Sequence, residues 1–141
     1  MYRTGHYGAA LLAYAPVGGV LLAAGFPGAA LVCGAVALAV APLPDYDQRV
    51  PLISHRGVTH TVGFALLVAA VLSGVGFAVG SGTGLAVGSE AGTGGQTGLA
   101  GATAAGAVGV LVGALAVGSH LLADALTPAG IAPFWPLSSK N

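Results

Sequence analysis

The sequence predicts an all-α integral membrane protein, a bundle of about four transmembrane helices, from three observations. Hydrophobic residues make up 55% of the 141-residue chain, whereas charged residues make up only 6%. A soluble domain carries roughly 25% charged residues, so this chain has too few polar side chains to cover a water-exposed surface. Glycine contributes 25 residues, which is typical of closely packed transmembrane helices, where small side chains let backbones approach. The composition therefore argues against a soluble enzyme domain and against disorder.

Four apolar stretches are the expected spans, and together they form a single domain over residues 1–141. They lie at about 7–26, 28–43, 58–80 and 99–126. A signal peptide is the weaker interpretation of the first stretch, because three further spans follow it. Pro16 within that stretch is tolerated in a membrane if neighbouring helices satisfy the freed carbonyl.

Proline and glycine mark the boundaries of the later spans. The second stretch is short for a bilayer, which requires about 20 residues, and Pro42 and Pro44 close it. Pro128 ends the fourth stretch. The Gly/Ser/Thr-rich segment 81–98 is expected to be a flexible loop.

All the cations fall on one side of this topology. Arg3, Arg49, Arg56 and Lys140 lie near the N-terminus, in the 44–57 loop or near the C-terminus. Cytoplasmic loops of membrane proteins carry an excess of Lys and Arg. We therefore expect a multi-pass cell-membrane protein with both termini and the 44–57 loop in the cytoplasm. Net charge is zero and no basic patch is present, so nucleic-acid binding is not expected.

Most of the ionisable side chains map to the same face. They are His6, Asp45, Asp47, His55, His60, His120 and Asp124. Ionisable groups inside or at the edge of a membrane are costly and usually functional. The sequence therefore predicts a polar His/Asp cluster at the cytoplasmic face.

Two pairs of this cluster are defined by their spacing. Asp45 and Asp47 follow the second span and offer two carboxylates to a cation, although ordinary solvated caps are an alternative. His120 and Asp124 are four residues apart on one helix face, so they either bond to each other or share a ligand.

The segment from His55 to Thr61 contributes two further histidines to this cluster. Gly57 allows a sharp turn, and Thr59 is expected to cap the third helix. His60 would then lie in the first helical turn and point into the bundle. Arg56 can pair with a carboxylate or hold an anionic substrate group.

A mixture of imidazoles and carboxylates suits a divalent metal ion, with Zn²⁺, Mn²⁺ or Fe²⁺ as the expected choices. Such an ion lowers the pKa of a bound water and polarises an ester or phosphoryl oxygen. Asp47, Thr59 and Thr127 are candidates for residues that hydrogen-bond to the ligands. Cys33 lies in an apolar run away from this face and has no disulfide partner in the chain.

With these motifs, the chain resembles the membrane-bound metal-dependent hydrolases of the YdjM type, a prokaryotic inner-membrane family of unknown substrate. That pattern has an N-terminal His, an L-P-D-x-D stretch, an H-R-G-x-T-H-S motif and an H-x-x-x-D-x-x-T-x-x-G segment leading to W-P. The matching stretches are Leu43–Asp47, His55–Thr61, His120–Gly130 and Trp135–Pro136, with Thr61 in place of the usual Ser. The resemblance implies a metal site made by His6, Asp45, Asp47, His55, His60, His120 and Asp124.

The expected function is that of a metal-dependent membrane-bound hydrolase, in which metal-activated water attacks an ester or phosphoester, such as that of a lipid. Asp47 or His55 would act as general base, and Arg56 would orient an anionic group. One alternative is a structural metal site with a closed coordination sphere. A transporter, with ionisable groups at more than one level of the bilayer, is the other. Membrane lipids are the expected partners, and oligomerisation is compatible with such short helices, although no motif supports it.

Overall fold

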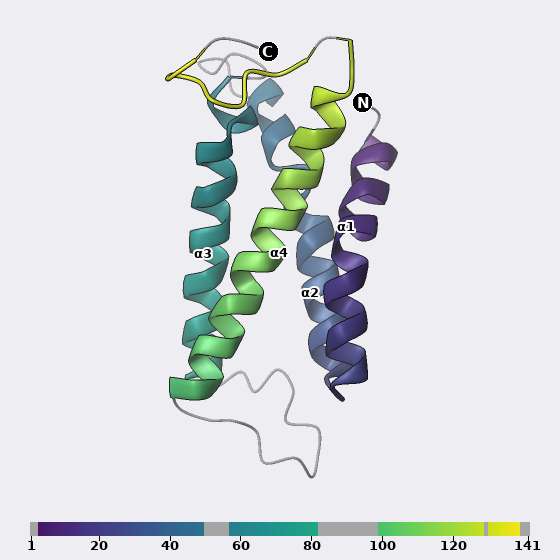
Figure 1. The fold of residues 1–141 in the computed structure, drawn as a ribbon, viewed down its shortest axis with the longest axis vertical. Helices are drawn as coiled ribbons and strands as arrows, with labels where there is room; N and C mark the ends of the chain where they lie inside the picture. The colour runs from purple at the N-terminus through teal and green to yellow at the C-terminus, as the bar shows by residue number, and fades with distance from the viewer. Residues whose placement is uncertain (1–2, 50–56, 82–98, 129, 139–141) are drawn as a thin grey trace.

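The computed structural model describes residues 3–49, 57–81, 99–128 and 130–138 (Figure 1). Its helices are α1 (Arg3–Ala23), α2 (Pro27–Val40), α3 (Val62–Gly80) and α4 (Leu99–Ala125). Two short 3₁₀ helices, η1 (Pro44–Arg49) and η2 (Val58–His60), lie between α2 and α3. With α2 and η1 taken together, 4 segments are long and apolar enough to cross a membrane. The predicted all-helical, four-span fold is confirmed.

Helix α4 lies at the centre of the bundle. It contacts each of the other three helices and packs most extensively against α3. The start of α1, the end of α4, η1 and η2 lie at one end of the bundle (Figure 1). We call this the polar end, because the predicted His/Asp cluster maps to it.

The turn between α1 and α2 follows from Gly25 and Pro27. Gly25 has a positive φ of 84°, a conformation that costs glycine little. The Gly25 N–H donates to the Leu22 carbonyl at 3.1 Å, and the Phe26 N–H donates to the Leu21 carbonyl at 2.9 Å. This pair of bonds is a Schellman motif, and Pro27 then begins α2 without a lost donor. For this reason α1 ends earlier than residue 26, the expected boundary.

The shortness of the second span is resolved by η1. Helix α2 has 14 residues, which at 1.5 Å per residue gives a length of about 21 Å, less than the roughly 30 Å of a bilayer core. Pro42 and Pro44 prevent the α-helix from continuing. The chain instead turns and completes the span as η1.

The entry into α3 differs from the sequence prediction. Thr61, not Thr59, is the cap, since its Oγ1 accepts a hydrogen bond from the Phe64 N–H at 3.1 Å. The backbone of Thr61 is extended, with φ −115° and ψ 156°, which is the geometry that a capping residue adopts. His60 accordingly lies in η2, just before α3, rather than in the first turn of α3.

Helices α3 and α4 meet through glycines, as the composition suggested. A Cβ added at Gly109 would lie 2.2 Å from the Leu72 carbonyl oxygen, and one at Gly76 would lie 2.3 Å from the Ala105 carbonyl oxygen. Gly80 and Gly113, each one turn further along, meet the facing backbone in the same way. We call these four residues the glycine interface. Only glycine allows backbones to approach this closely.

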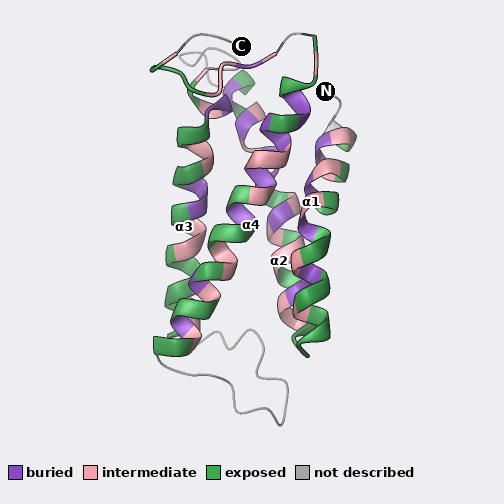
Figure 2. Cartoon of the chain, viewed as in Figure 1, coloured by how far each residue is buried: buried purple, intermediate pink, exposed green. Residues whose placement is uncertain are grey.

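The outer surface of the bundle is apolar, as a lipid-facing surface requires. Each helix exposes large hydrophobic side chains, for example Leu12 at 78%, Leu31 at 76%, Leu66 at 64% and Leu122 at 63% (Figure 2). The interior is built largely from small residues, with Tyr14, Val112 and Val117 among the larger apolar ones. The Tyr14 hydroxyl donates to the Ala30 carbonyl at 2.6 Å and so joins α1 to α2.

Candidate metal centre

The polar end buries side chains that a membrane protein rarely buries. Within the described part of the chain, the buried polar or charged residues are His6, Asp47, His60, Thr61, His120 and Asp124. All of them lie at the polar end. No second level of buried His, Asp, Glu, Lys or Arg side chains occurs in the residues that the structure describes, although the transporter alternative would require one.

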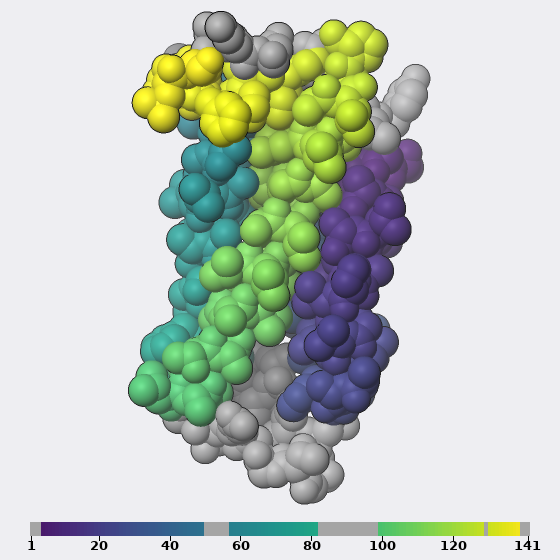
Figure 3. Space-filling model, in the orientation of Figure 1, coloured from purple at the N-terminus to yellow at the C-terminus, as the bar shows by residue number. Residues whose placement is uncertain are grey.

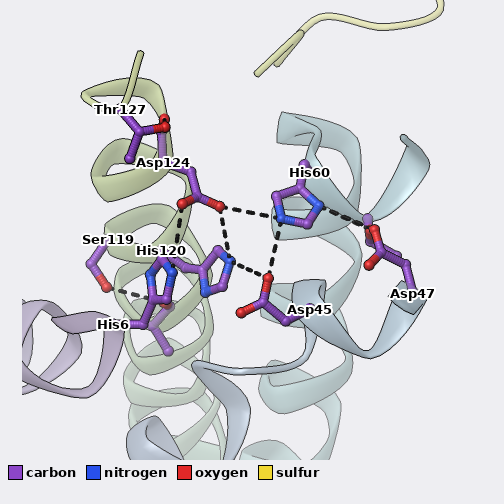
Figure 4. A network of polar contacts seen from close by, with 10 residues as sticks. His6, Asp45, Asp47, His60, Ser119, His120, Asp124 and Thr127 are labelled. Atoms are coloured by element: carbon purple, nitrogen blue, oxygen red, sulfur yellow. Dashed lines mark hydrogen bonds and ion pairs between the residues drawn. The ribbon is translucent and has the colours of Figure 1, made fainter. Parts of the chain in front are cut away.

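Four of the predicted ligands converge on one point (Figure 4). Asp45 comes from η1, His60 from η2, and His120 and Asp124 from the last turns of α4. Each offers one ligand atom, and these four atoms all lie within 4.8 Å of one another. We call these residues the His/Asp group.

The distances within the His/Asp group are nearly equal. His60 Nε2 lies 3.6 Å from Asp45 Oδ1 and 3.4 Å from Asp124 Oδ2. His120 Nε2 lies 3.5 Å from each of the same two oxygens. Four ligands placed tetrahedrally at about 2.1 Å from one ion are about 3.4 Å apart. These four N···O distances match the spacing expected in a tetrahedral metal site, and the other pairs of ligand atoms lie within 4.8 Å.

These contacts are too long to be ordinary hydrogen bonds, which have N···O distances near 2.9–3.0 Å. His120 shows most clearly that ordinary hydrogen bonds do not satisfy the group. Neither of its ring nitrogens forms a hydrogen bond with any residue in the described ranges, although its side chain is fully buried. A buried imidazole without a hydrogen bond is costly, and an ion at the centre of the group would satisfy its Nε2.

The charge of the group also favours a dication. Asp45 and Asp124 place two carboxylates around one centre, and the two histidines facing them can be neutral. Like charges at this separation repel strongly in a poorly solvated site. Buried charges in proteins are paired or coordinate metals. A divalent ion would balance the two carboxylates.

The family comparison agrees with this placement in a membrane protein. The model of the YdjM inner membrane protein family matches residues 1–141, the whole chain. The chain belongs to the YdjM inner membrane protein family. No curated protein and no solved structure matches it.

In this YdjM-family chain, a third carboxylate, that of Asp47, contacts His60 on the side of the ring away from the His/Asp group. Asp47 Oδ2 lies 3.4 Å from His60 Nδ1, on the opposite side of the ring from the His/Asp group. The Thr59 hydroxyl donates to the same Asp47 oxygen at 2.8 Å. A carboxylate on the distal nitrogen of a ligating histidine fixes the tautomer and the ring orientation. Asp47 is thus placed to orient His60, and its carboxylate does not face the centre of the group.

His6 lies on the other flank of the group. Its ring stacks on that of His120, with centroids 3.8 Å apart and planes 14° apart. His6 Nε2 lies 3.5 Å from Asp124 Oδ1, the oxygen that does not face His60 and His120. His6 therefore contacts the group through the outer oxygen of Asp124 and by stacking.

Thr127 and Ser119 support the end of α4 through its backbone. The Thr127 hydroxyl donates to the Asp124 carbonyl at 2.7 Å, and the Ser119 hydroxyl donates to the Ala116 carbonyl at 3.0 Å. Thr127, a candidate partner for a ligand, thus bonds to the main chain of Asp124 rather than to its carboxylate.

The structure separates the predicted site residues of this YdjM-family chain into three sets. Asp45, His60, His120 and Asp124 form the His/Asp group, and His6 and Asp47 flank it. His55 and Arg56 lie outside the residues that the structure describes. The sequence motifs contained the members of the group, but did not distinguish them from the flanking residues.

Proposed function

We propose that this protein is a metal-dependent hydrolase whose site lies at the cytoplasmic face of the membrane. The observation that carries the proposal is the spacing in the His/Asp group. Two imidazole nitrogens and two carboxylate oxygens, with N···O distances of 3.4–3.6 Å, surround one point at the polar end of the bundle. Zn²⁺, Mn²⁺ and Fe²⁺ suit such donors.

An ion bound there would supply Lewis-acid chemistry, lowering the pKa of a water and polarising an ester or phosphoryl oxygen. Hydrolysis then adds water across the ester or phosphoester bond and yields an acid and an alcohol. The other roles, such as positioning the ligands, belong to side chains of the protein.

Access to the group is through Asp45. Its side chain is 19% exposed, whereas those of His60 and Asp124 are at most 2% exposed. A catalytic metal site keeps one position open for water or substrate, whereas a structural site is closed. With four protein ligands, a catalytic ion would need a fifth position for water, and the partial exposure of Asp45 supports such a position on that side of the group.

The flanking residues would position the ligands. Asp47, itself held by Thr59, fixes the His60 ring so that Nε2 points to the centre. His6 holds the outer oxygen of Asp124. Of the two predicted general bases, Asp47 faces His60 Nδ1 rather than the centre of the group, so we propose His55 for that role. Arg56 remains the proposed anion-binding residue, since both residues lie within five positions of the ligand His60 in the sequence.

The orientation in the membrane rests on the positive-inside rule. Arg49 lies in η1 at the polar end, and Arg3 begins α1 at the same end (Figure 1). Cytoplasmic segments near membrane spans are enriched in such residues. We therefore place the polar end and both termini in the cytoplasm.

A structural metal site is the second candidate function. His60, His120 and Asp124 are at least 98% buried and link η2 to α4. An ion shared by these segments would hold the polar end together without performing chemistry. The result expected for a structural site is bound metal without hydrolytic turnover.

The test is hydrolysis of water-soluble chromogenic phosphoesters and carboxylesters by the detergent-purified protein, reconstituted separately with Zn²⁺, Mn²⁺ and Fe²⁺. We expect metal-dependent turnover in the wild type and a loss of about 100-fold or more in Asp124→Asn, as for removal of a group central to catalysis. Thr103→Val, an exposed change in the far half of α4, is the matched control and should retain full activity.

Equal turnover in the wild type and Asp124→Asn would contradict the proposal. Bound metal in the wild type with no turnover of either ester class would favour the structural alternative.

A further inference from the structure

An apolar groove lies against α3 and α4 at the polar end, outside the His/Asp group. Its volume is about 400 Å³, within the roughly 300–1,000 Å³ typical of small-molecule sites. Val62 and Leu66 of α3 form one wall, and Gly118, Leu121 and Ala125 of α4 form the other. All the residues that line it are apolar or glycine.

Gly118 leaves part of this groove open. A Cβ added there would meet no atom within 4 Å, in contrast to the glycines of the glycine interface. Leu66 and Leu122, which are 64% and 63% exposed, rise at the sides of the groove. One exposed leucine therefore borders the groove on each of the two helices.

The groove is closed at the polar end. Pro133 lines it, and the Pro133 carbonyl accepts a hydrogen bond from the Val62 N–H at 2.9 Å. The segment after α4 lies across the ends of α3 and α4 (Figure 3). A straight helix from a second chain, about 10 Å wide, would run into this segment. A flexible chain that ends at the same level would not.

The closed end lies at the level of the His/Asp group. Leu121 and Ala125 of the groove directly follow His120 and Asp124 in α4, and Val62 follows His60 by two residues. The rest of the groove lies along membrane-spanning stretches of α3 and α4, where the surrounding medium is hydrocarbon. An apolar occupant with a polar end at the membrane surface matches both conditions.

We propose that the groove holds an acyl chain of a bilayer phospholipid and presents the ester or phosphoester of that lipid to the His/Asp group. The second half of this statement rests on the proposed function. The first half concerns binding alone and can be tested without turnover.

The binding test uses phosphatidylglycerol vesicles in which the lipid carries a photoactivatable diazirine on one acyl chain. After reconstitution and illumination, labelled peptides are mapped by mass spectrometry. We expect label to concentrate on the groove-lining residues of α3 and α4. In Gly118→Leu, labelling there should fall by about tenfold, because the added side chain occupies the space of the lipid chain.

Gly74→Leu is the matched control, since Gly74 is exposed on α3 outside the groove and a Cβ there also meets nothing within 4 Å. It should label as the wild type does. Ala114→Leu, another exposed groove position, is a second variant if Gly118→Leu does not fold.

Uniform labelling around α3 and α4, or labelling unaffected by both groove variants, would overturn the proposal. So would crosslinks between two copies of the chain through the groove. Turnover separates the two proposals: Gly118→Leu should lose hydrolysis of the phospholipid but retain hydrolysis of a water-soluble ester. A wild type that hydrolyses neither, yet labels in the groove, contradicts the proposed function and leaves the acyl-chain site intact.

Discussion

The continuous segment of η2 and α3 is joined to α4 in two different ways along its length. At the polar end, the contact is made by large, polar, fully buried side chains, with His60 facing His120 and Asp124. Further along, at the glycine interface, the two backbones touch with no side chain between them, as at Gly109 and Gly76. One contact depends on charge and donor geometry, and the other depends only on shape.

This difference follows from the medium. Lipid tails are as apolar as the side chains of a helix, so burying leucine gives little driving force for association in a membrane. Close backbone packing and polar interactions remain as the two available means. The protein uses packing where it needs only stability, and polar groups where they can also hold an ion.

The largest effect is expected from breaking the glycine interface. In Gly109→Leu, the new Cβ would meet the Leu72 carbonyl oxygen at 2.2 Å, a backbone atom that cannot move away on its own. The variant should lose at least about 3 kcal/mol of stability. Thermal unfolding in detergent, followed by circular dichroism, measures this loss.

Gly74→Leu is the control, because that position faces open space. A Gly109→Leu melting curve that overlays those of the wild type and Gly74→Leu would show that the helices do not meet at this interface.

The next effect is expected at the polar end on removal of metal. An ion that binds only the folded state stabilises it by about 2.7 kcal/mol when its free concentration is about 100 times its Kd. Chelation should therefore lower the melting temperature of the wild type. The same treatment should leave Asp124→Asn unchanged, because the carboxylate that completes the His/Asp group is lost.

If the chelator shifts both proteins equally, the stabilising ion is not held by this group. Chelation should leave the contacts of the glycine interface unchanged, because its four glycines bind no ion. The experiment therefore separates the contribution of the polar end from that of the glycine interface.

The smallest effects are expected from Asp47 and Thr59, which contact His60 on the side away from the His/Asp group. Asp47→Asn keeps the shape but removes the charge that faces His60 Nδ1 at 3.4 Å. Metal affinity should fall by about 10–100-fold, as is usual when a partner of a ligating histidine is changed. Thr59→Val removes the 2.8 Å hydrogen bond to Asp47 and the 3.2 Å contact of the same hydroxyl with His60 Nδ1. Because the Asp47 charge stays in place, this variant should lower the affinity less.

Competition titration with a metal-binding dye measures both variants. Should Asp47→Asn abolish binding as completely as Asp124→Asn, Asp47 would be a ligand rather than a positioning residue.

The architecture could be predicted from the sequence because a bilayer imposes simple rules. Apolar length sets the spans, and Pro42, Pro44 and Pro128 mark where two of them end. The entry into α3 was harder, since Thr59 and Thr61 flank His60 and either can cap a helix. The backbone conformation decides in favour of Thr61, and a single motif does not reveal that conformation.

The site was predicted as a set of residues but not as an arrangement. Asp45 and Asp47 look equivalent in the sequence. In η1, a 3₁₀ helix with about 3 residues per turn, two residues so spaced point to different sides. Asp45 faces the centre, and Asp47 faces the far side of His60. The backbone atoms that the glycine interface contacts could not be predicted from the sequence either. They depend on the register between α3 and α4, which is a property of the packed bundle.

Metal content tests the central claim most directly. Elemental analysis of the detergent-purified wild type should give about one transition-metal ion per chain, as expected for a single four-ligand site. His60→Ala and Asp124→Ala should each contain none, whereas Gly74→Leu should match the wild type. A folded wild type that binds no metal even after reconstitution, or variants that retain the ion, would contradict a metal centre in the His/Asp group.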